Sequence, residues 1–173
     1  REQLRIAGIE FVPEPDLSFM NECLKNFDLP KNYALIIPGS SAKMKIKRWP
    51  AASYAELSMV LAQRNITPIL IGTNEDMDSI NIIKRMCPNA LDLAGKTSIF
   101  QIASLGRSAK FCIGNDTGPM HIIALTKCPT IAIFCTASFP EKAAPKGKHI
   151  KILIREKLED LSLDEVVSSI DRI

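Results

Sequence analysis

Two short segments of the chain combine residue types that suit anion binding. Residues 38–50 read PGSSAKMKIKRWP and follow the apolar run at residues 33–37. Residues 113–121 read IGNDTGPMH. Hydroxyl and cationic side chains in the first segment, and a glycine and a proline at the start of a helix in the second, are chemistry that fits the oxygens of a diphosphate.

The second segment is typical of a buried strand that breaks at a glycine and continues as a helix. Asp116 or Thr117 can cap that helix with a side-chain oxygen. Gly118 allows close approach to the backbone, and Pro119 suits a first-turn position where no amide donor is needed. The free amides then face outward, and the helix dipole favours a phosphate by about 0.3 to 1 kcal/mol. An ordinary capped helix start has the same residues, so this turn alone does not distinguish an anion site from a helix start without a ligand.

The cations of the first segment fall into two groups. Lys43 and Lys45 fit a solvated surface. Lys47 and Arg48 directly precede a Trp-Pro pair, an apolar anchor before a helix that would hold them in place. Because ligands of open α/β sheets bind at the carboxyl ends of strands, we expect the two segments to meet in one crevice.

Short apolar runs alternate with longer amphipathic stretches along the chain. This pattern predicts a parallel sheet covered by helices on both faces, a Rossmann-like, doubly wound α/β fold of about six strands. Strands are expected at residues 33–37, 67–71, 90–93, 109–113, 130–134 and 150–154, and helices at residues 17–27, 52–64, 75–86, 99–106, 117–126 and 163–173. Residues 1–30 are expected to be a connection with a lead-in helix, and residues 31–173 a single domain.

The composition limits the classes of protein. A chain of 173 residues with 46% hydrophobic and 24% charged residues suits one globular unit, and a net charge of +3 gives no sign of nucleic-acid binding. The five cysteines lack metal-type spacing, and their odd number opposes a disulfide framework and favours a reducing compartment. Neither a signal peptide nor an apolar run of about 18 residues is present. The chain starts at Arg1, and we interpret it as a fragment.

Other patterns suggest different chemistry. Residues 90–97, ALDLAGKT, match a permissive phosphate-loop pattern, but their first part looks like a strand and a turn precedes it, which disfavours an ATPase. Asp76 and Asp78 resemble a metal-binding pair, but acids in a first helical turn favour a structural role. No G-x-G-x-x-G follows a strand, which weakens a nicotinamide or flavin site. For His121, packing on the helix and a polar role both remain open.

The order of the motifs GSS, KRWP, LDLAGKTS, IGNDTGPMH and PTIAIF resembles glycosyltransferase family 9, the ADP-heptose:lipopolysaccharide heptosyltransferases and their relatives. The resemblance covers nearly the whole chain. It implies the C-terminal, donor-binding half of a GT-B enzyme, with the acceptor held by an N-terminal half that this chain lacks. The implied reaction is transfer of a sugar, with inversion, from a nucleotide diphosphate such as ADP-heptose to a lipopolysaccharide core acceptor.

The resemblance also assigns residues to the donor phosphates. Ser40, Ser41 and Lys47 are expected to contact them, with Lys47 compensating negative charge on the leaving diphosphate. Backbone amides are expected to bind the same group, at Thr117, Gly118, Met120 and His121.

Other parts of the donor are assigned in the same way. Asp116 is expected to shape the turn and reach sugar hydroxyls, and Glu75 to hold the ribose. Lys96 and Thr97, within residues 95–98, are expected to line the adenine pocket. Some family members have histidine where Arg48 stands, to which we attach no functional consequence.

The family further implies that no metal or other cofactor is needed and that the general base lies in the absent half, so this chain alone is expected to be inactive. A cytoplasmic location is expected, with peripheral association at the inner face of the inner membrane as one option. The alternative from another class is a non-catalytic nucleotide-binding or regulatory module on the same fold.

Overall fold

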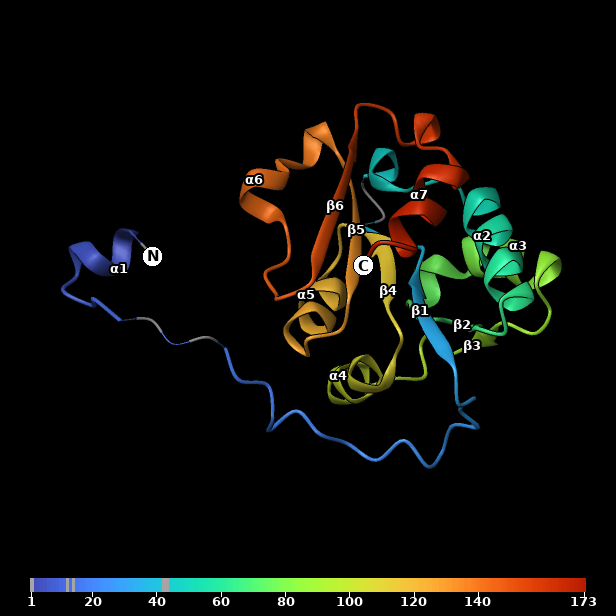
Figure 1. Ribbon diagram of the computed structural model, residues 1–173, viewed down its shortest axis with the longest axis horizontal. Helices are drawn as coiled ribbons and strands as arrows, with labels where there is room; N and C mark the ends of the chain where they lie inside the picture. The colour runs from blue at the N-terminus through green and yellow to red at the C-terminus, as the bar shows by residue number, and fades with distance from the viewer. Residues whose placement is uncertain (1, 12, 14, 42–43) are drawn as a thin grey trace.

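A six-stranded, fully parallel sheet forms the centre of the chain, in a computed structural model that describes residues 2–11, 13, 15–41 and 44–173. The strand order is β3-β2-β1-β4-β5-β6 (Figure 1). The strands are β1 (Tyr33–Ile37), β2 (Thr67–Leu70), β3 (Leu91–Asp92), β4 (Cys112–Asn115), β5 (Thr130–Cys135) and β6 (Ile150–Arg155). The predicted Rossmann-like sheet of six strands is confirmed.

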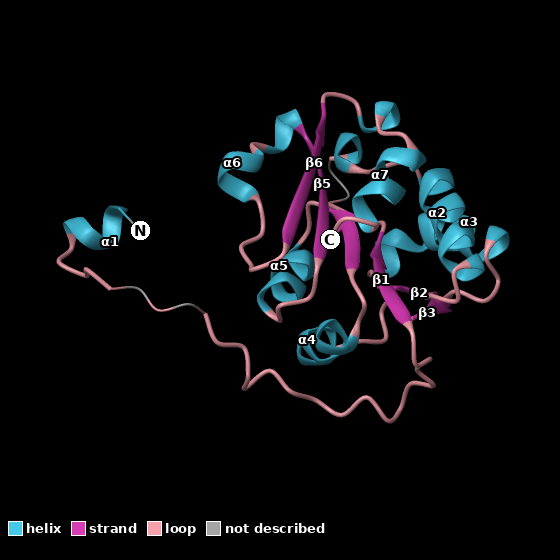
Figure 2. Cartoon of the chain, in the orientation of Figure 1, coloured by secondary structure: helices cyan, strands magenta, loops and turns pink. Residues whose placement is uncertain are grey.

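Helices cover both faces of this sheet (Figure 2). Alternate residues of the strands join two separate buried clusters, one on each face. One cluster includes side chains of α2 (Ala51–Gln63), α3 (Met77–Met86) and α7 (Leu163–Ile170). The other includes side chains of α4 (Ile99–Ser108) and α5 (Gly118–Leu125). Strands that are buried on both sides explain the uninterrupted apolar runs of the sequence.

Several short elements complete the described chain. They are the helices α1 (Glu2–Ile6) and α6 (Pro140–Ala143) and the 3-10 turns η1 (Lys45–Lys47), η2 (Asn74–Asp76), η3 (Thr136–Ser138) and η4 (Leu158–Asp160). Helix α1 stands apart from the sheet (Figure 1). Along the described residues, no helix is long and apolar enough to cross a bilayer.

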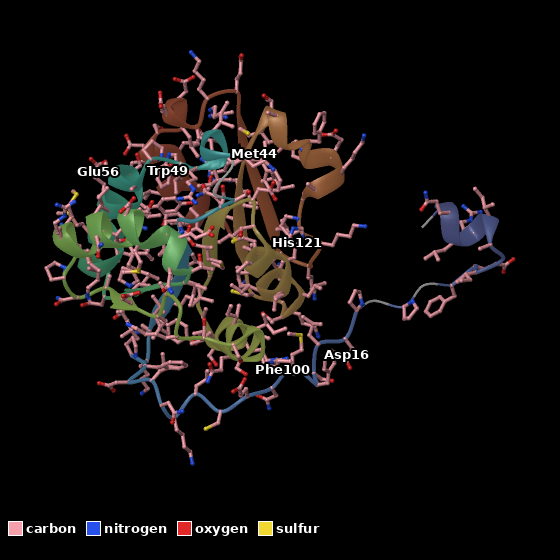
Figure 3. The ribbon with its side chains drawn as sticks, turned by 180° about the vertical axis from the view of Figure 1, so that it is seen from behind. Asp16, Met44, Trp49, Glu56, Phe100 and His121 are labelled. Carbon is pink, nitrogen blue, oxygen red and sulfur yellow. The ribbon has the colours of Figure 1, made fainter. Side chains whose placement is uncertain are left out.

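The prediction of a helix at residues 17–27 is wrong. This lead-in segment is irregular, with isolated turns, and runs along α4 (Figure 1). The guanidinium of Arg107 donates to the Met20 carbonyl at 2.9 Å, and the Phe19 and Phe100 rings meet edge to face at 6.3 Å (Figure 3). Side chains of α4 thus satisfy backbone groups that a helix would have satisfied internally. The apolar spacing that suggested a helix instead serves contacts with the core, through Leu24 among others.

The predicted limits of β4 are also wrong. This strand begins at Cys112 rather than at residue 109, because α4 extends to Ser108 and the amide of Ala109 still donates to the carbonyl of Leu105. The strand then continues through Gly114 to Asn115 instead of breaking at the glycine. Gly114 serves close packing, since a Cβ there would lie 2.6 Å from the Cβ of Ile37 on β1.

Candidate functional site

The candidate site lies where β1 and β4 run side by side at the centre of the sheet. After β1 the chain crosses to α2 on one face, and after β4 it crosses to α5 on the other. The two loops depart in opposite directions beyond the carboxyl ends of these strands, and the crevice between such loops is the usual ligand position in folds of this kind. The expectation that the two anion-type segments meet is confirmed by direct hydrogen bonds between them.

Asn115, the last residue of β4, is fully buried and joins the two segments. Its side-chain oxygen accepts hydrogen bonds from the Trp49 amide and the Tyr54 hydroxyl, each at 3.0 Å. Its amide nitrogen donates to the carbonyls of Pro38 at 2.7 Å and Gly39 at 3.4 Å. One side chain therefore fixes both ends of the loop that follows β1.

Trp49 anchors the far end of that loop, as predicted. Its indole is buried and donates from Nε1 to the carbonyl of Leu161 at 2.9 Å (Figure 3). The ring also meets the Tyr54 ring edge to face, with centroids 4.8 Å apart. Burial raises the pKa of the Tyr54 hydroxyl well above its usual value, and the nearby Cys112 thiol adds to the effect, so this partner of Asn115 stays protonated.

Lys47 and Asp116 form the ionic centre of the site. The Lys47 Nζ donates to Oδ2 of Asp116 at 3.0 Å, and the two side chains are only 17% and 12% exposed. The partial burial fixes both groups beside the start of α5. A lysine ammonium has three donor protons, so this cation can form further charge-assisted hydrogen bonds besides the one to Asp116.

The start of α5 departs in two ways from what the sequence predicts. Thr117 is the N-cap by backbone, but no side chain caps the helix, because the Asp116 carboxylate is engaged with Lys47. The Met120 amide donates to the Thr117 carbonyl at 3.1 Å, so it is not free for a ligand, contrary to expectation. Neither the Thr117 nor the Gly118 amide bonds to another residue that the structure describes. His121 is half-buried in the first turn.

The serines of the first segment lie in different environments. Ser40 is buried, and its Oγ has no hydrogen-bond partner within the described chain. Ser41 is exposed. Lys43 lies outside the described residues, and of Lys45 only the backbone, in η1, is described. Ser40 is thus the hydroxyl in this loop that is fixed and still free to bond a ligand.

The loop after β2 places Glu75 at the same edge of the sheet. Glu75 is exposed, and its amide donates to Oγ1 of Thr73 at 3.3 Å. Asp76 is buried and accepts from the Thr73 amide at 2.9 Å in a reciprocal capping box. The structural interpretation of Asp76 is therefore confirmed, whereas Asp78 is exposed in the first turn of α3.

The loop after β3 lies next to this one. The Gly95 amide donates to the Gly72 carbonyl at 2.9 Å, which ties the two loops together. Lys96 donates to the Asp92 carbonyl at 2.8 Å and is otherwise exposed, and Thr97 is half-buried. A helix begins only at Ile99, after a Ser98 cap, so this lysine does not lie in a phosphate loop that leads into a helix and the ATPase alternative is wrong.

Two surface hollows in the described chain lie away from this crevice. One is on the outer surface of α3, and the other lies between the end of α5 and residues 146–148. The candidate site is instead defined by its converging polar groups and its place in the fold.

The model of a family described as glycosyltransferase family 9 (heptosyltransferase) matches residues 10–167. The chain belongs to glycosyltransferase family 9. Lipopolysaccharide heptosyltransferase 2 of Escherichia coli strain K12 is 30% identical over 115 residues, which cover 62% of this chain and 32% of that protein. Lipooligosaccharide heptosyltransferase 2 of Haemophilus influenzae is 32% identical over 112 residues, with the same coverage.

Solved structures share the fold of this family 9 chain. The E. coli ADP-heptose lipopolysaccharide heptosyltransferase II superposes with a TM-score of 0.74 at 24% identity, over 82% of this chain and 46% of that one. The E. coli heptosyltransferase WaaC with ADP gives 0.73 at 23% identity, over 84% and 46%. The chain spans about a third of the length of the curated relatives and just under half of these structures.

Two residues of the site had no role in the sequence analysis. Asn115 bonds to groups far away in the sequence, such as the Pro38 carbonyl, and Arg48 contacts the Ser40 carbonyl and the Asp76 carboxylate. For Asn115 a signal was available, because an amide at the end of an apolar strand must find several partners when it is buried. The partners of Arg48 depend on the path of two loops, which no local pattern reveals.

Proposed function

We propose that this chain is the donor-binding half of a GT-B glycosyltransferase that transfers heptose from ADP-heptose to a lipopolysaccharide core acceptor. The observation that carries the proposal is the Lys47–Asp116 pair beside the start of α5, at the switch point of a family 9 domain. The heptosyltransferase names of the relatives support the sugar and the acceptor, and a neighbour solved with ADP supports the nucleotide.

In the proposed complex the diphosphate lies between the two loops of the crevice. Lys47 compensates charge on the leaving diphosphate, and the amides of Thr117 and Gly118 with the positive end of the α5 dipole bind its oxygens. The hydroxyls of Ser40 and Ser41 complete the phosphate contacts. Asp116 stays neutralised by Lys47, which limits its repulsion of the diphosphate and leaves its second oxygen for a sugar hydroxyl.

The nucleoside then extends toward the loops after β2 and β3. Glu75 is exposed at that edge and is proposed to hold the ribose hydroxyls, while Lys96 and Thr97 border the adenine. His121 is proposed as a further polar contact to the donor.

The chemistry proposed for this half is stabilisation of the leaving group. An inverting transfer also needs a general base for the acceptor hydroxyl, which we place outside this chain. Lys47 and the helix terminus take the part that a metal plays in other enzymes, so no metal or cofactor is proposed. A cytoplasmic location, at the inner face of the inner membrane, suits a lipopolysaccharide acceptor.

Calorimetric titration of the chain with ADP tests this proposal, with a melting scan as a second readout, because a ligand of the native state raises its stability. Lys47→Ala removes a charge-assisted bond and leaves Asp116 unpaired, so ADP affinity should fall by about 1.5 to 3 kcal/mol, roughly 10- to 150-fold. The matched control is Lys110→Ala, an exposed lysine that precedes β4 at the other edge of the sheet.

Two results would contradict the proposal. The first is absence of ADP binding to the unaltered chain at millimolar concentration, and the second is an equal loss in the two lysine variants. A transfer assay, with and without the rest of the protein, separates the enzyme from a non-catalytic nucleotide-binding module: turnover by the complete protein alone supports the division of roles given above.

A further inference from the structure

The Asp76 carboxylate is more constrained than a helix cap requires. Its Oδ2 accepts from the Thr73 amide at 2.9 Å and from the Thr73 hydroxyl at 3.1 Å, which completes the capping box of the loop after β2. Capping uses this one oxygen. The other oxygen, Oδ1, is buried, has no hydrogen-bond partner within the described chain and faces Arg48.

Arg48 connects this carboxylate to the loop after β1. Its Nη2 donates to the Ser40 carbonyl at 2.6 Å and lies 3.2 Å from Oδ1 of Asp76. The guanidinium side chain is 18% exposed and the carboxylate 9%, so water screens the pair only weakly. A single nitrogen thus links the loop proposed for the diphosphate with the loop that carries Glu75.

Two glycines show how closely the carboxylate fits between these loops. A Cβ added to Gly39 would lie 2.3 Å from Cγ of Asp76, and one added to Gly72 would lie 3.1 Å from its Oδ2. The carboxylate therefore lies directly against the backbone of both loops. Any side chain at Gly39 would push the loops apart or displace Asp76 from Arg48.

The bond to Arg48 also determines which polar group of Ser40 is left without a partner. Its carbonyl is engaged by the guanidinium, whereas its Oγ is buried and unpaired among the described residues. An unpaired buried hydroxyl is costly unless a partner arrives. Arg48 thus holds the Ser40 backbone through its carbonyl and leaves the Ser40 hydroxyl without a partner among the described residues.

We propose that Arg48 and Asp76 are positioning residues that fix the distance between the phosphate-binding and ribose-binding loops, so that one nucleoside diphosphate bridges both. This inference rests on the proposed function. Neither residue touches the ligand. They hold the two loops at a fixed separation, so that once the diphosphate is bound the nucleoside meets a loop that is already in place. This is the gain in affinity of any bivalent ligand that binds two rigidly connected sites.

The test compares a ligand that spans both loops with its two parts. ADP, pyrophosphate and adenosine are titrated, with NMR shifts as the readout for weak ligands, into the chain and its Arg48→Gln, Asp76→Asn and double variants. ADP affinity should fall by about 10-fold or more in each single variant, while the affinities for pyrophosphate and adenosine change by less than about 3-fold. The double variant should be no worse than either single one, because the two residues form one link.

Arg85→Gln and Asp78→Asn are the controls, since they make the same changes of charge at exposed positions of α3. Arg48→Lys keeps the charge but not the rigid guanidinium that places Nη2 between the Ser40 carbonyl and Asp76, so its ADP affinity should lie between those of Arg48→Gln and the unaltered chain. If Asp76→Asn fails to fold through loss of the cap, Arg48→Gln still decides, because it leaves the contacts of Thr73 intact.

Unchanged ADP affinity in Arg48→Gln would overturn the inference, as would an equal loss for all three ligands. Failure of the unaltered chain to bind ADP would instead contradict the proposed function. If the unaltered chain binds ADP and the Arg48 and Asp76 variants bind it equally well, the positioning role is refuted and the proposed function is not.

Discussion

Replacement of Asn115 by alanine removes the side chain that joins β4 to the loop after β1. Three strong hydrogen bonds are lost, from the Trp49 amide, from the Tyr54 hydroxyl and to the Pro38 carbonyl, at 2.7 to 3.0 Å. Each buried group left without a partner costs about 1 to 3 kcal/mol. Allowing for partial relaxation, we expect the free energy of unfolding to fall by about 3 to 5 kcal/mol.

The isosteric variant Asn115→Asp separates hydrogen bonding from volume. One carboxyl oxygen still accepts from Trp49 and Tyr54, but the other replaces the group that donates to the Pro38 carbonyl at 2.7 Å. Burial and this acceptor favour a protonated acid, so the pKa of the new carboxyl rises above its usual value of about 3.9 in the folded state. The unfolded state then loses its proton first, and stability is greatest at low pH and falls as pH rises above about 4, by about 1.4 kcal/mol per unit until the folded-state pKa is reached.

Urea unfolding followed by tryptophan fluorescence measures both effects, because Trp49 is the single tryptophan and is 1% exposed. The control is Asn81→Ala at an exposed position of α3, which should change stability by less than about 0.5 kcal/mol. A loss below about 1 kcal/mol in Asn115→Ala, or an Asn115→Asp variant with the pH dependence of the unaltered chain, would refute the assigned role.

Three further outcomes are expected. Gly114→Ala should lower the free energy of unfolding by about 1 to 3 kcal/mol, since its Cβ would lie within 2.6 to 2.7 Å of atoms of β1, whereas Gly118→Ala has open space and should be neutral in the same urea titration. Thiol titration of the native chain at pH 8 should modify exposed Cys23 rapidly and spare Cys128, because burial raises the pKa of the Cys128 thiol to about 12, which leaves about one thiolate in 10,000. Trp49→Phe leaves a buried carbonyl without its indole donor and should cost about 1 to 3 kcal/mol, measured by circular dichroism.

The sequence predicted the parts of this fold that depend on local pattern. Apolar runs marked the strands because each is buried on both faces, and the rule that parallel strands end at one edge placed Lys47 and Asp116 together. The prediction of a helix in the lead-in segment was wrong, because its apolar spacing resembles that of a helix. In the structure Arg107 and its neighbours on α4 bind the backbone groups of this segment instead. The prediction that Asp116 caps α5 was wrong because its carboxylate pairs with Lys47, 69 residues away. Local sequence rules do not include such a distant partner.

The strand order has a consequence for how the chain folds. β1 meets β2 through Tyr33 and Thr67, but it meets β4 through Leu35 and Cys112, so the second contact closes a loop more than twice as long and costs about 0.7 kcal/mol more in chain entropy. Formation of the crevice must wait for this distant contact, because the bond from Trp49 to Asn115 spans 66 residues. The burial of Trp49 during refolding, followed by its fluorescence, therefore reports when the loop after β1 and the end of β4 come together to form the candidate site.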